Sequence, residues 1–413
     1  MSIILFQKKL SVKMSKVKYR KQYVESHDNL LFLNEYYKLS HSEEYRRIPL
    51  EPSRFKGNVV LTLGLSILTL FLYPLRLLYD FICLMLYYIR TKESVKLFPK
   101  KIIPYPASSS IAEKLLINAN VDTSDIVIIV KERNNTNESK IRQLPFSSLI
   151  KVSDIVLSLC EAFLYFYISI LKNGIRTIFI SLDAFEWFVT YHAHSHLPQD
   201  TELFFYHHMN QWAALIDCLP HKHKYLFQHG TEIIKHNEKN IGLPFLNYDK
   251  KESIWTYNLP LRYCSIERIY TFSNREYESL KCSILNCNPC VVVVGYSLRT
   301  TQMPTNKPVV VIIGFYRAYS RQEENVLRGL QNKDVTIYIK NHPTQDPTVY
   351  KDFLEKYSFE LLTEPVYPKA DVVISYDSTL ALEYEEIGTK VYYYSDMRIE
   401  SILDYLSNLK HSL

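Results

Sequence analysis

Three short motifs in the sequence combine residue types that can bind phosphate and move a proton. They lie at residues 228–232 (QHGTE), 340–343 (KNHP) and 375–379 (SYDST). Histidine, lysine and hydroxyl side chains bind phosphate oxygens, and histidine or a carboxylate can take a proton from a reacting hydroxyl. Together the motifs predict a site that binds a phosphorylated ligand and assists a group transfer.

The second motif follows an apolar run and supplies a histidine and a lysine. Pro343 fixes the backbone and favours an extended conformation at His342, which would point the imidazole out of a sheet edge. Lys340 adds positive charge beside it. A plain turn after a strand has the same pattern, so this motif alone leaves both interpretations open.

The third motif stands where a strand gives way to a helix. Ser375, Ser378 and Thr379 carry hydroxyls, and a helix N-terminus adds free N–H groups that form a phosphate cradle. Asp377 would repel a phosphate, so we expect it to cap the helix instead. Serine and threonine caps are common, and an ordinary cap is the alternative.

The first motif offers a general base. Gly230 allows a sharp turn after the preceding apolar run, which would leave His229 and Glu232 at the rim of a domain. Asp183 and Glu186, just after another apolar run, are further candidates on position alone. A structural histidine and surface acids are the alternative interpretations.

These motifs fall within an alternation of short apolar runs and helical stretches, which is typical of parallel, doubly wound sheets. Strands are expected at residues 125–130, 176–181, 201–207, 223–228, 268–273, 290–295, 308–314, 334–340, 370–375 and 390–394. Helices are expected at residues 320–331, 347–357, 378–388 and 396–409, and a loop at 236–265. Ligands of such sheets bind at the carboxyl ends of the strands.

The predicted fold class is α/β, with two Rossmann-like domains facing a cleft and an N-terminal apolar helical segment. The 413 residues suit two domains. The predicted organisation is a polar basic region at 1–57, an apolar membrane-associating segment at 58–92, an acceptor domain at 93–289, a donor domain at 290–395 and a C-terminal helix at 396–413.

The apolar segment carries no charge between residues 59 and 75, and Arg76 and Asp80 then interrupt it. Because these charges disfavour a complete span, we expect a helix lying in the membrane interface, with a buried helical hairpin as the alternative. A second apolar stretch at 155–171 contains Glu161 and is expected to be a buried helix.

Composition excludes several classes of function. With 9 glycines the chain contains neither GxGxxG nor GxxxxGK[ST], so a glycine-rich phosphate loop is not predicted. A net charge of +6 without a dense basic stripe suits anionic small partners and argues against nucleic acid. The seven cysteines suggest a reduced protein, and Cys282, Cys287 and Cys290 lack the fourth cysteine of an iron–sulfur site.

Alternating histidines at 192, 194 and 196 would share one face of a strand. No carboxylate or cysteine lies beside them at the spacing of a zinc site, so no metal is predicted.

The motifs, taken in order, resemble those of bacterial GT-B glycosyltransferases of surface polysaccharides. The resemblance covers residues 223–395 and includes His342-Pro343 and the pattern D-x-x-[IL]-S-x-x-S-T-x-x-x-E, which ends at Glu383 and precedes Gly388 by five residues. The groups nearest to it are the sialyl- and polysialyltransferases of capsules and the CDP-glycerol glycerophosphotransferases.

The resemblance implies roles for individual residues. His342, Ser378 and Thr379 would bind the donor phosphates, and Glu383 would hold ribose or sugar hydroxyls. Gly314 would let the nucleotide approach the first strand of the donor domain. The paired-acid motif of the sialyltransferases is missing, so the base stays open among His229, Glu232, Asp183 and Glu186, with the first two ranked higher.

The function expected is transfer of a sugar, first a CMP-activated acidic sugar, to a surface polysaccharide or lipid-linked glycan. The nucleotide-sugar is a co-substrate, and no other cofactor or metal is expected. The expected location is the cytoplasmic face of a bacterial inner membrane. Alternatives are CDP-glycerol or polyol phosphotransfer, a non-catalytic nucleotide- or glycan-binding subunit, and a nucleotide-sugar epimerase.

Overall fold

The chain forms two compact units, Met1–Tyr37 with Arg46–Val294, and Lys38–Tyr45 with Gly295–Leu413. The computed structural model describes residues 19–27, 59–93, 98–106, 109–131, 141–179, 181–206, 211–228, 246–249, 254–257, 259, 261–296, 298–342, 345–363, 366–376, 378–394 and 397–410.

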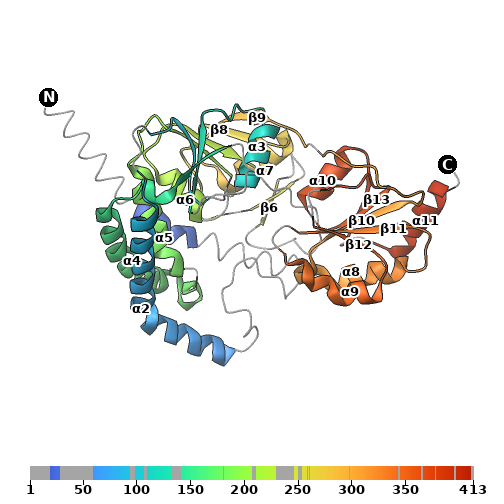
Figure 1. The fold of residues 1–413 in the computed structure, drawn as a ribbon, viewed down its shortest axis with the longest axis horizontal. Coiled ribbons are helices and arrows are strands. Elements are labelled where there is room, and N and C mark those ends of the chain that lie inside the picture. The colour runs from blue at the N-terminus through green and yellow to red at the C-terminus, as the bar shows by residue number, and fades with distance from the viewer. Residues whose placement is uncertain are drawn as a thin grey trace. The chain divides into compact units, whose positions relative to one another are not determined.

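The first unit is built on a seven-stranded sheet with the order β3-β2-β1-β4-β5-β8-β9 (Figure 1). All neighbouring strands in it run parallel. Its strands are β1 (Lys101–Ile103), β2 (Ile126–Val130), β3 (Arg142–Pro145), β4 (Glu202–Phe205), β5 (Lys224–Phe227), β8 (Arg268–Thr271) and β9 (Cys290–Val293).

Helices cover both faces of this sheet, which is why its central strands are apolar without alternation. Every residue of β2 is buried. One face packs on Ala112 and Leu116 of α3. The helices around the sheet are α3 (Ser109–Asn118), α5 (Ala184–Ser195), α6 (Gln211–Cys218) and α7 (Asn274–Ile284).

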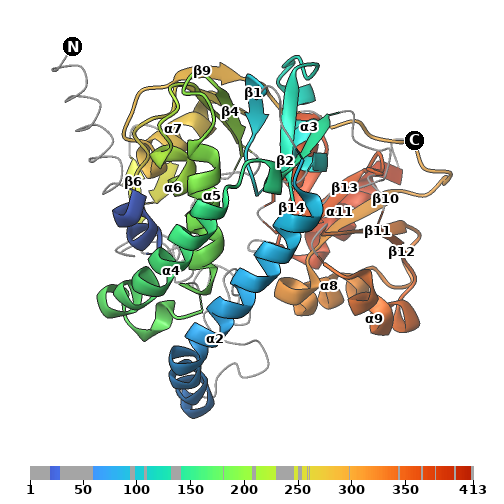
Figure 2. The ribbon, with the colours of Figure 1, turned by 60° about the vertical axis from the view of Figure 1, so that its left-hand side comes forward.

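Two long apolar helices extend from the first unit. They are α2 (Val59–Thr91), which continues through Pro74, and α4 (Val152–Asn173). The two helices lie side by side in Figure 1, and Figure 2 shows them from another direction. Tyr73 of α2 stacks on Phe166 of α4 with ring centroids 3.6 Å apart, and the Tyr167 hydroxyl donates to the Leu70 carbonyl at 3.1 Å.

The second unit contains a five-stranded parallel sheet with the order β12-β11-β10-β13-β14. Its strands are β10 (Val309–Gly314), β11 (Thr336–Asn341), β12 (Glu360–Leu362), β13 (Val372–Ser375) and β14 (Lys390–Tyr393). Its helices are α8 (Tyr316–Leu330), η6 (Pro347–Tyr350), α9 (Lys351–Lys356), α10 (Thr379–Glu386) and α11 (Ile399–Lys410).

Alternate residues of β10 enter two separate cores. Val310 and Ile312 pack with residues of α8, α9 and α11. Val311 and Ile313 pack with Ala381 and Tyr384 of α10 on the other face. Each unit is therefore a doubly wound α/β domain, and the first also carries the apolar helix α2. The predicted fold class is confirmed.

Several local predictions were wrong. Residues 175–177 and 181–183 form short 3₁₀ turns, so the strand expected at 176–181 does not exist in the described part of that segment. The segment expected to be a loop at 236–265 contains the antiparallel strands β6 (Leu246–Asp249) and β7 (Ile254–Tyr257).

Two further predictions are corrected by packing. The strand expected to open the donor domain at 290–295 is β9, and it pairs with β8 in the first sheet. The helix expected to be buried at 155–171 is α4, which has one buried face and one exposed face. Its exposed side chains include Val156, Leu164 and Leu171.

Candidate functional site

The second sheet changes direction between β10 and β13. From β10 the chain continues to β11 and β12 on one side, and then returns to β13 and β14 on the other. In a doubly wound sheet, ligands bind at the carboxyl ends of the two strands that flank this switch. Gly314 ends β10 and Ser375 ends β13, so the motifs predicted from sequence lie at this edge.

Three rings meet at the same edge, one after each of three strands. Phe315 follows β10, His342 follows β11 and Tyr376 follows β13. The Phe315 ring stacks on His342 with centroids 4.6 Å apart, and it lies 5.9 Å from the Tyr376 ring. The His342 imidazole, which was predicted to face the edge, is partly exposed and stacks on the Phe315 ring.

The serine motif forms the N-terminus of α10. Ser378 caps the helix, because its Oγ accepts the Ala381 N–H at 3.1 Å. Ser375 Oγ lies 3.0 Å from Ser378 Oγ, and Ser375 is completely buried. Asp377, expected as the cap, lies outside the described residues. Where Ser375 donates in this pair, Ser378 keeps its own proton for a ligand, and Thr379 begins the helix beside it.

Gly314 is required by the core behind the edge. A Cβ at this position would overlap the Tyr350 hydroxyl and would lie 2.7 Å from a methyl group of Ile339. The glycine therefore permits close packing of η6 beneath the strand end. The resemblance implied that Gly314 lets a nucleotide approach the strand. In the structure, a side chain at this position would instead point toward Tyr350 and Ile339 in the protein.

The other predicted donor residues lie farther from the edge. Lys340 is 8% exposed, and its Nζ lies 5.4 Å from the centroid of the Tyr367 ring. Glu383 is buried on α10 with Ala381 and Tyr384. Pro343 lies outside the described residues.

The first sheet has its own switch, between β1 and β4. A small hollow, with an internal volume of about 10 Å³, lies there. It is lined by Ile103, Pro104, Tyr105, Pro106, Phe205, Tyr206, Trp212 and Ile216. The hollow is mostly apolar and lies where this fold binds ligands.

Two predicted acids each accept a hydrogen bond, and one of the donors, Tyr105, lines this hollow. The Tyr105 hydroxyl donates to the Glu186 carboxylate, and Gln211 Nε2 donates to Asp183 Oδ2 at 3.2 Å. Although Asp183 reaches solvent, loss of water around its carboxyl and the charge of Glu186 raise its pKa. A carboxylate with a raised pKa is a better proton acceptor, so Asp183 fits the role of general base.

The remaining predicted residues have different outcomes. His229 and Glu232 lie outside the described residues, so their ranking as base stays a prediction. The three alternating histidines lie on helix α5 and its end, because that segment is helical rather than extended. The described part of the chain contains no group of three His, Cys, Asp or Glu side chains that could hold a metal.

His194 is a structural residue. It is completely buried, its Nδ1–H donates to the Thr190 carbonyl at 2.8 Å, and its Nε2 accepts the Tyr105 N–H at 3.2 Å. Burial lowers its pKa to about 4. Its neutral ring therefore fixes the backbone of Tyr105, whose side chain lines the hollow.

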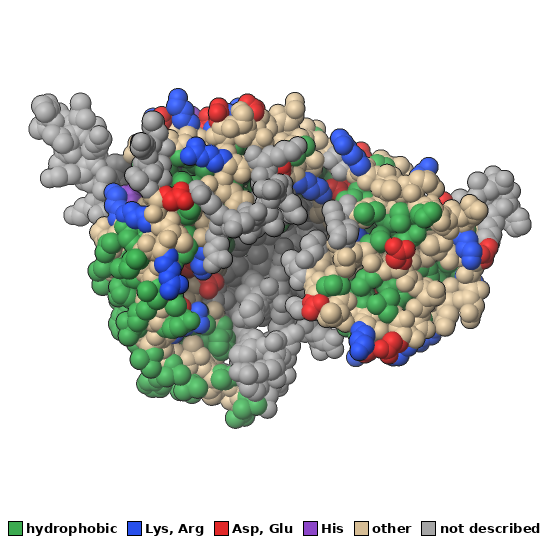
Figure 3. All heavy atoms as spheres, in the orientation of Figure 1, with side chains coloured by type: hydrophobic (Ala, Val, Ile, Leu, Met, Phe, Trp, Pro, Cys, Tyr) green, Lys and Arg blue, Asp and Glu red, His purple; other side chains and the backbone are tan. Residues whose placement is uncertain are grey.

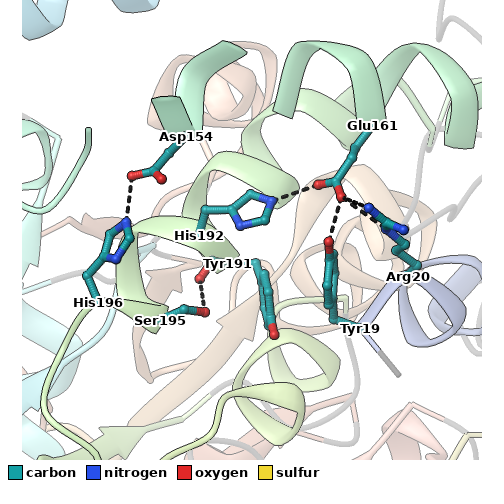
Figure 4. A network of polar contacts seen from close by, with 8 residues as sticks. All are labelled: Tyr19, Arg20, Asp154, Glu161, Tyr191, His192, Ser195 and His196. Atoms are coloured by element: carbon teal, nitrogen blue, oxygen red, sulfur yellow. Dashed lines mark hydrogen bonds and ion pairs between the residues drawn. The ribbon is translucent and has the colours of Figure 1, made fainter. Parts of the chain in front are cut away.

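His192 and His196 pair with acids on α4 (Figure 4). His192 Nε2 lies 2.7 Å from Glu161 Oε2, and His196 Nε2 lies 2.8 Å from Asp154 Oδ2. Glu161 also accepts from the Tyr19 hydroxyl and from Arg20 Nη2 at 2.6 Å. These bonds lower the pKa of Glu161 despite its burial, and they join the helix at residues 19–27 to α4.

The sequence analysis did not identify Phe315 and Tyr376 at the edge of the second sheet, or Tyr105 and Gln211 in the first unit. Phe315 and Tyr376 directly follow the last residues of their strands, so the rule that selected Gly314 and Ser375 could have found them. Tyr105 and Gln211 had no comparable signal. Tyr105 follows β1, which is three residues long and was not predicted, and Gln211 begins α6.

Comparison with known proteins gives similarities of structure alone. No protein-family model and no curated protein matches the sequence at a significant level. A glycosyltransferase from Rickettsia africae ESF-5 is similar with 10% identity and a TM-score of 0.34, over 71% of this chain and 78% of that one.

Two other solved structures are similar to the same degree. HepE of Anabaena in complex with UDP-glucose has 8% identity and a TM-score of 0.37, over 71% of this chain and 79% of that one. The wall teichoic acid polymerase TagF has 10% identity and a TM-score of 0.36, over 78% of each chain. At these identities and TM-scores the similarity concerns the fold alone. The description of the two sheets above does not depend on it.

Proposed function

We propose that this protein is a glycosyltransferase that binds a nucleotide-activated sugar at the carboxyl edge of its second sheet. The observation that carries the proposal is that His342, after β11, and the N-terminus of α10, after β13, lie at the same carboxyl edge of the second sheet, with the Phe315 ring near both His342 and Tyr376. A helix N-terminus with Ser378 and Thr379 hydroxyls offers donors to a phosphate. His342 adds a further donor on the opposite side of the switch.

These groups would serve the transfer by stabilising the leaving nucleotide. Negative charge develops on its phosphate as the bond to the sugar breaks, and fixed donors at that position lower the barrier. Phe315 and Tyr376 provide flat apolar surfaces on which a planar ring can stack. The nucleotide-sugar is a co-substrate in this proposal, and protein groups take the place of a metal at its phosphates.

The acceptor side of the reaction is assigned to the first sheet. In this proposal Asp183 takes the proton of the acceptor hydroxyl, and Glu186 raises its proton affinity. The acceptor would approach the strand ends beside Tyr105, whose hydroxyl donates to Glu186. His229 and Glu232 are the alternative bases. A CMP-linked acidic sugar as donor and a surface polysaccharide or lipid-linked glycan as acceptor are the finer parts of the proposal.

The first test is thermal stabilisation by CMP, CDP, UDP and GDP, with wild type and His342→Ala compared. A ligand at 100 times its Kd should stabilise the folded state by about 2.7 kcal/mol. We expect one nucleotide to raise the Tm of wild type and to act much more weakly on His342→Ala. The matched control is His223→Ala, which removes an exposed histidine paired with Glu267 before β5.

The outcomes separate the candidate functions. Stabilisation followed by turnover of the matching nucleotide-sugar supports a glycosyltransferase, and turnover of CDP-glycerol alone supports phosphotransfer. Binding without turnover of any donor supports a non-catalytic subunit. No stabilisation of wild type by any of the four nucleotides contradicts the proposal.

We also propose that the first unit lies against the cytoplasmic face of a bacterial inner membrane. Within the described residues, two helices are long and apolar enough to cross a membrane, Leu63–Thr91 and Val152–Asn173. Figure 3 shows their apolar side chains gathered on one flank of the first unit. Phe71 is 74% exposed, Leu75 is 65% exposed and Leu171 is 86% exposed.

Contact along the surface fits these helices better than a span. The other face of α4 buries Asp154 and Glu161 in polar pairs with α5, which hold that face in the protein. Cationic side chains on and beside these helices can meet anionic headgroups. They are Arg76, Arg90, Lys92, Lys151 and Lys172.

Vesicle sedimentation tests this contact. Phe71→Glu with Leu75→Glu should reduce binding to vesicles that contain anionic lipid at least tenfold, since each burial of an apolar side chain contributes about 2 kcal/mol. The control is Leu354→Glu, which adds charge to an exposed leucine on α9 in the second unit. Equal binding of the double variant and wild type would contradict the membrane assignment.

A further inference from the structure

The turn that leads from β10 into α8 is fastened to a buried carboxyl. Phe315 is the residue before the helix and has no side chain that could cap it. Its backbone N–H instead donates to Glu323 Oε1 at 2.6 Å, and Glu323 is completely buried. Glu323 therefore supplies the missing cap from eight residues further along the chain.

A kink in α8 makes this contact geometrically feasible. Tyr319 has φ of −132° and ψ of 20°, so the first turn is separated from the rest of the helix. Glu323 lies in the later part and reaches back to the start. The short first turn also carries the Tyr319 ring, which stacks on Tyr376 with centroids 5.0 Å apart.

The Glu323 bond thus positions the candidate donor site. It holds Phe315, whose ring stacks on His342, at the end of the strand beside the switch. The carboxyl lies behind the turn rather than in front of it, so it acts through Phe315 and not on the ligand directly.

The surroundings of Glu323 favour its neutral form. Burial raises its pKa to about 7, and the Phe315 N–H and the Tyr350 hydroxyl oppose this rise. The titratable groups that face it in the described residues are Tyr350 on η6 and Tyr394 after β14, with His342 beyond the Phe315 ring.

We propose that Glu323 is a positioning residue whose charge sets the affinity of the second sheet's edge for phosphate. This inference rests on the proposed nucleotide site. Neutral Glu323 accepts the Phe315 N–H and leaves the turn free of negative charge. Ionised Glu323 keeps that bond but places a buried negative charge behind the phosphate position, where water screens it poorly. Nucleotide affinity should therefore fall as Glu323 ionises.

The test compares nucleotide Kd for wild type and Glu323→Gln across pH, using CMP, CDP, UDP and GDP. Glutamine keeps the shape and the acceptor oxygen but cannot ionise. Since both proteins share His342 and the same ligand, those titrations cancel in the ratio of the two Kd values. We expect a ratio, wild type over variant, near 1 at about pH 6, rising to roughly fivefold at about pH 8.5.

Tyr350→Phe provides a second variant if Glu323→Gln does not fold. Losing the Tyr350 hydroxyl removes a group that lowers the pKa of Glu323, so the pH at which affinity falls should move upward. A merely structural role for Glu323 would change Tm but leave the Kd ratio constant with pH. Such a constant ratio, with nucleotide still bound, overturns this inference alone. No nucleotide binding to wild type at any pH overturns the proposed function and this inference together.

Discussion

The two sheets of this protein have the same strand order around their switch points and different chemistry at their edges. In each, the chain makes three neighbouring strands on one side and then returns to the other side of the first. The second sheet presents hydroxyls, a histidine and a helix N-terminus at this point. The first presents an apolar hollow and two carboxylates.

This difference indicates that topology selects the place of a site and that the residues around the strand ends select its chemistry. The edge with Ser378 and His342 suits a negatively charged ligand, because it offers hydrogen-bond donors. The edge with Asp183 and Glu186 would repel such a ligand and suits a neutral hydroxyl instead. The same contrast predicts which substitutions will affect turnover and which will affect donor binding.

Replacing the acid of the first sheet should have the largest effect on activity. Asp183→Asn removes the proposed general base, and general-base catalysis contributes about 10²- to 10⁴-fold to kcat. Steady-state release of nucleotide from the donor should fall by that factor with little change in KM for donor. Ser378→Ala in the second sheet should mainly raise the KM for donor.

The matched control for Asp183→Asn is Asp200→Asn, which removes an exposed acid before β4, at the opposite end of the first sheet. It should leave kcat unchanged. If Asp183→Asn retains full turnover, the assignment of base chemistry to the first edge is wrong, and His229 or Glu232 becomes the leading candidate.

Carboxylates in the first unit differ in the direction of their pKa shifts. This difference distinguishes an acid that stabilises the fold from one proposed to act as a base. Bonds to Tyr19, Arg20 and His192 lower the pKa of Glu161, while burial raises that of Asp183. Glu161→Gln should therefore reduce stability rather than turnover per folded molecule. We expect a loss of about 2–4 kcal/mol in the free energy of unfolding, since Glu161 is buried while Arg20 is partly screened by solvent.

Glu267→Gln is the control for this comparison. Its carboxylate lies 2.7 Å from His223, the same distance as in the Glu161–His192 pair, but both side chains are 41% exposed. An exposed pair contributes about 0–1 kcal/mol. Equal losses for the two variants in denaturant unfolding would show that burial does not decide the stability of these pairs.

Gly314 tests whether the second edge is shaped by packing or by ligand. A methyl group there would meet the Tyr350 hydroxyl and Ile339, and overpacking of this kind costs about 1–3 kcal/mol. Gly314→Ala should lower the Tm without any ligand present. Gly64→Ala on α2, where a Cβ meets nothing, should stabilise slightly, by about 0.5–1 kcal/mol. An unchanged Tm for Gly314→Ala would contradict the packing role.

Sequence reasoning succeeded where local pattern and global fold agree. The strands of the second sheet are apolar on both faces and end at glycine, asparagine or serine, so β10, β11 and β13 were predicted along with their edge residues. Residues 176–181 also contain a short apolar run, at 178–180, but 3₁₀ turns form at Ile175–Thr177 and Ser181–Asp183 before α5. A short apolar run does not distinguish a strand from such a turn.

The parts that failed depend on contacts between distant segments. β9 resembles the neighbouring strand β10 in sequence, and only its pairing with β8 assigns it to the first sheet. Likewise, Asp154 and Glu161 lie seven residues apart on α4, and His192 and His196 four apart on α5. Each pattern is ordinary alone, and the pairing becomes visible only when the helices pack.

The last prediction concerns the dependence of stability on pH, which should differ between the two units. Burial lowers the pKa of His27 to about 3 and of His194 and His221 to about 4, all in the first unit. In the unfolded chain these residues would protonate near the ordinary histidine value of 6.5. Their contribution to stability is therefore complete above that pH and is lost as pH falls toward the folded values.

The second unit should respond in the opposite direction. Glu323 has a raised pKa of about 7 against an ordinary value of 4.5, so its neutral form costs nothing below 4.5 and stability falls as pH rises toward 7. Between about pH 6.5 and 5.5, each buried histidine should cost the first unit about 1 kcal/mol, because one pKa unit corresponds to about 1.4 kcal/mol. Hydrogen exchange followed separately in β1–β5 and β10–β14 measures this contrast. Equal loss of protection in both sheets on acidification would show that the buried histidines do not set the acid sensitivity of the first unit.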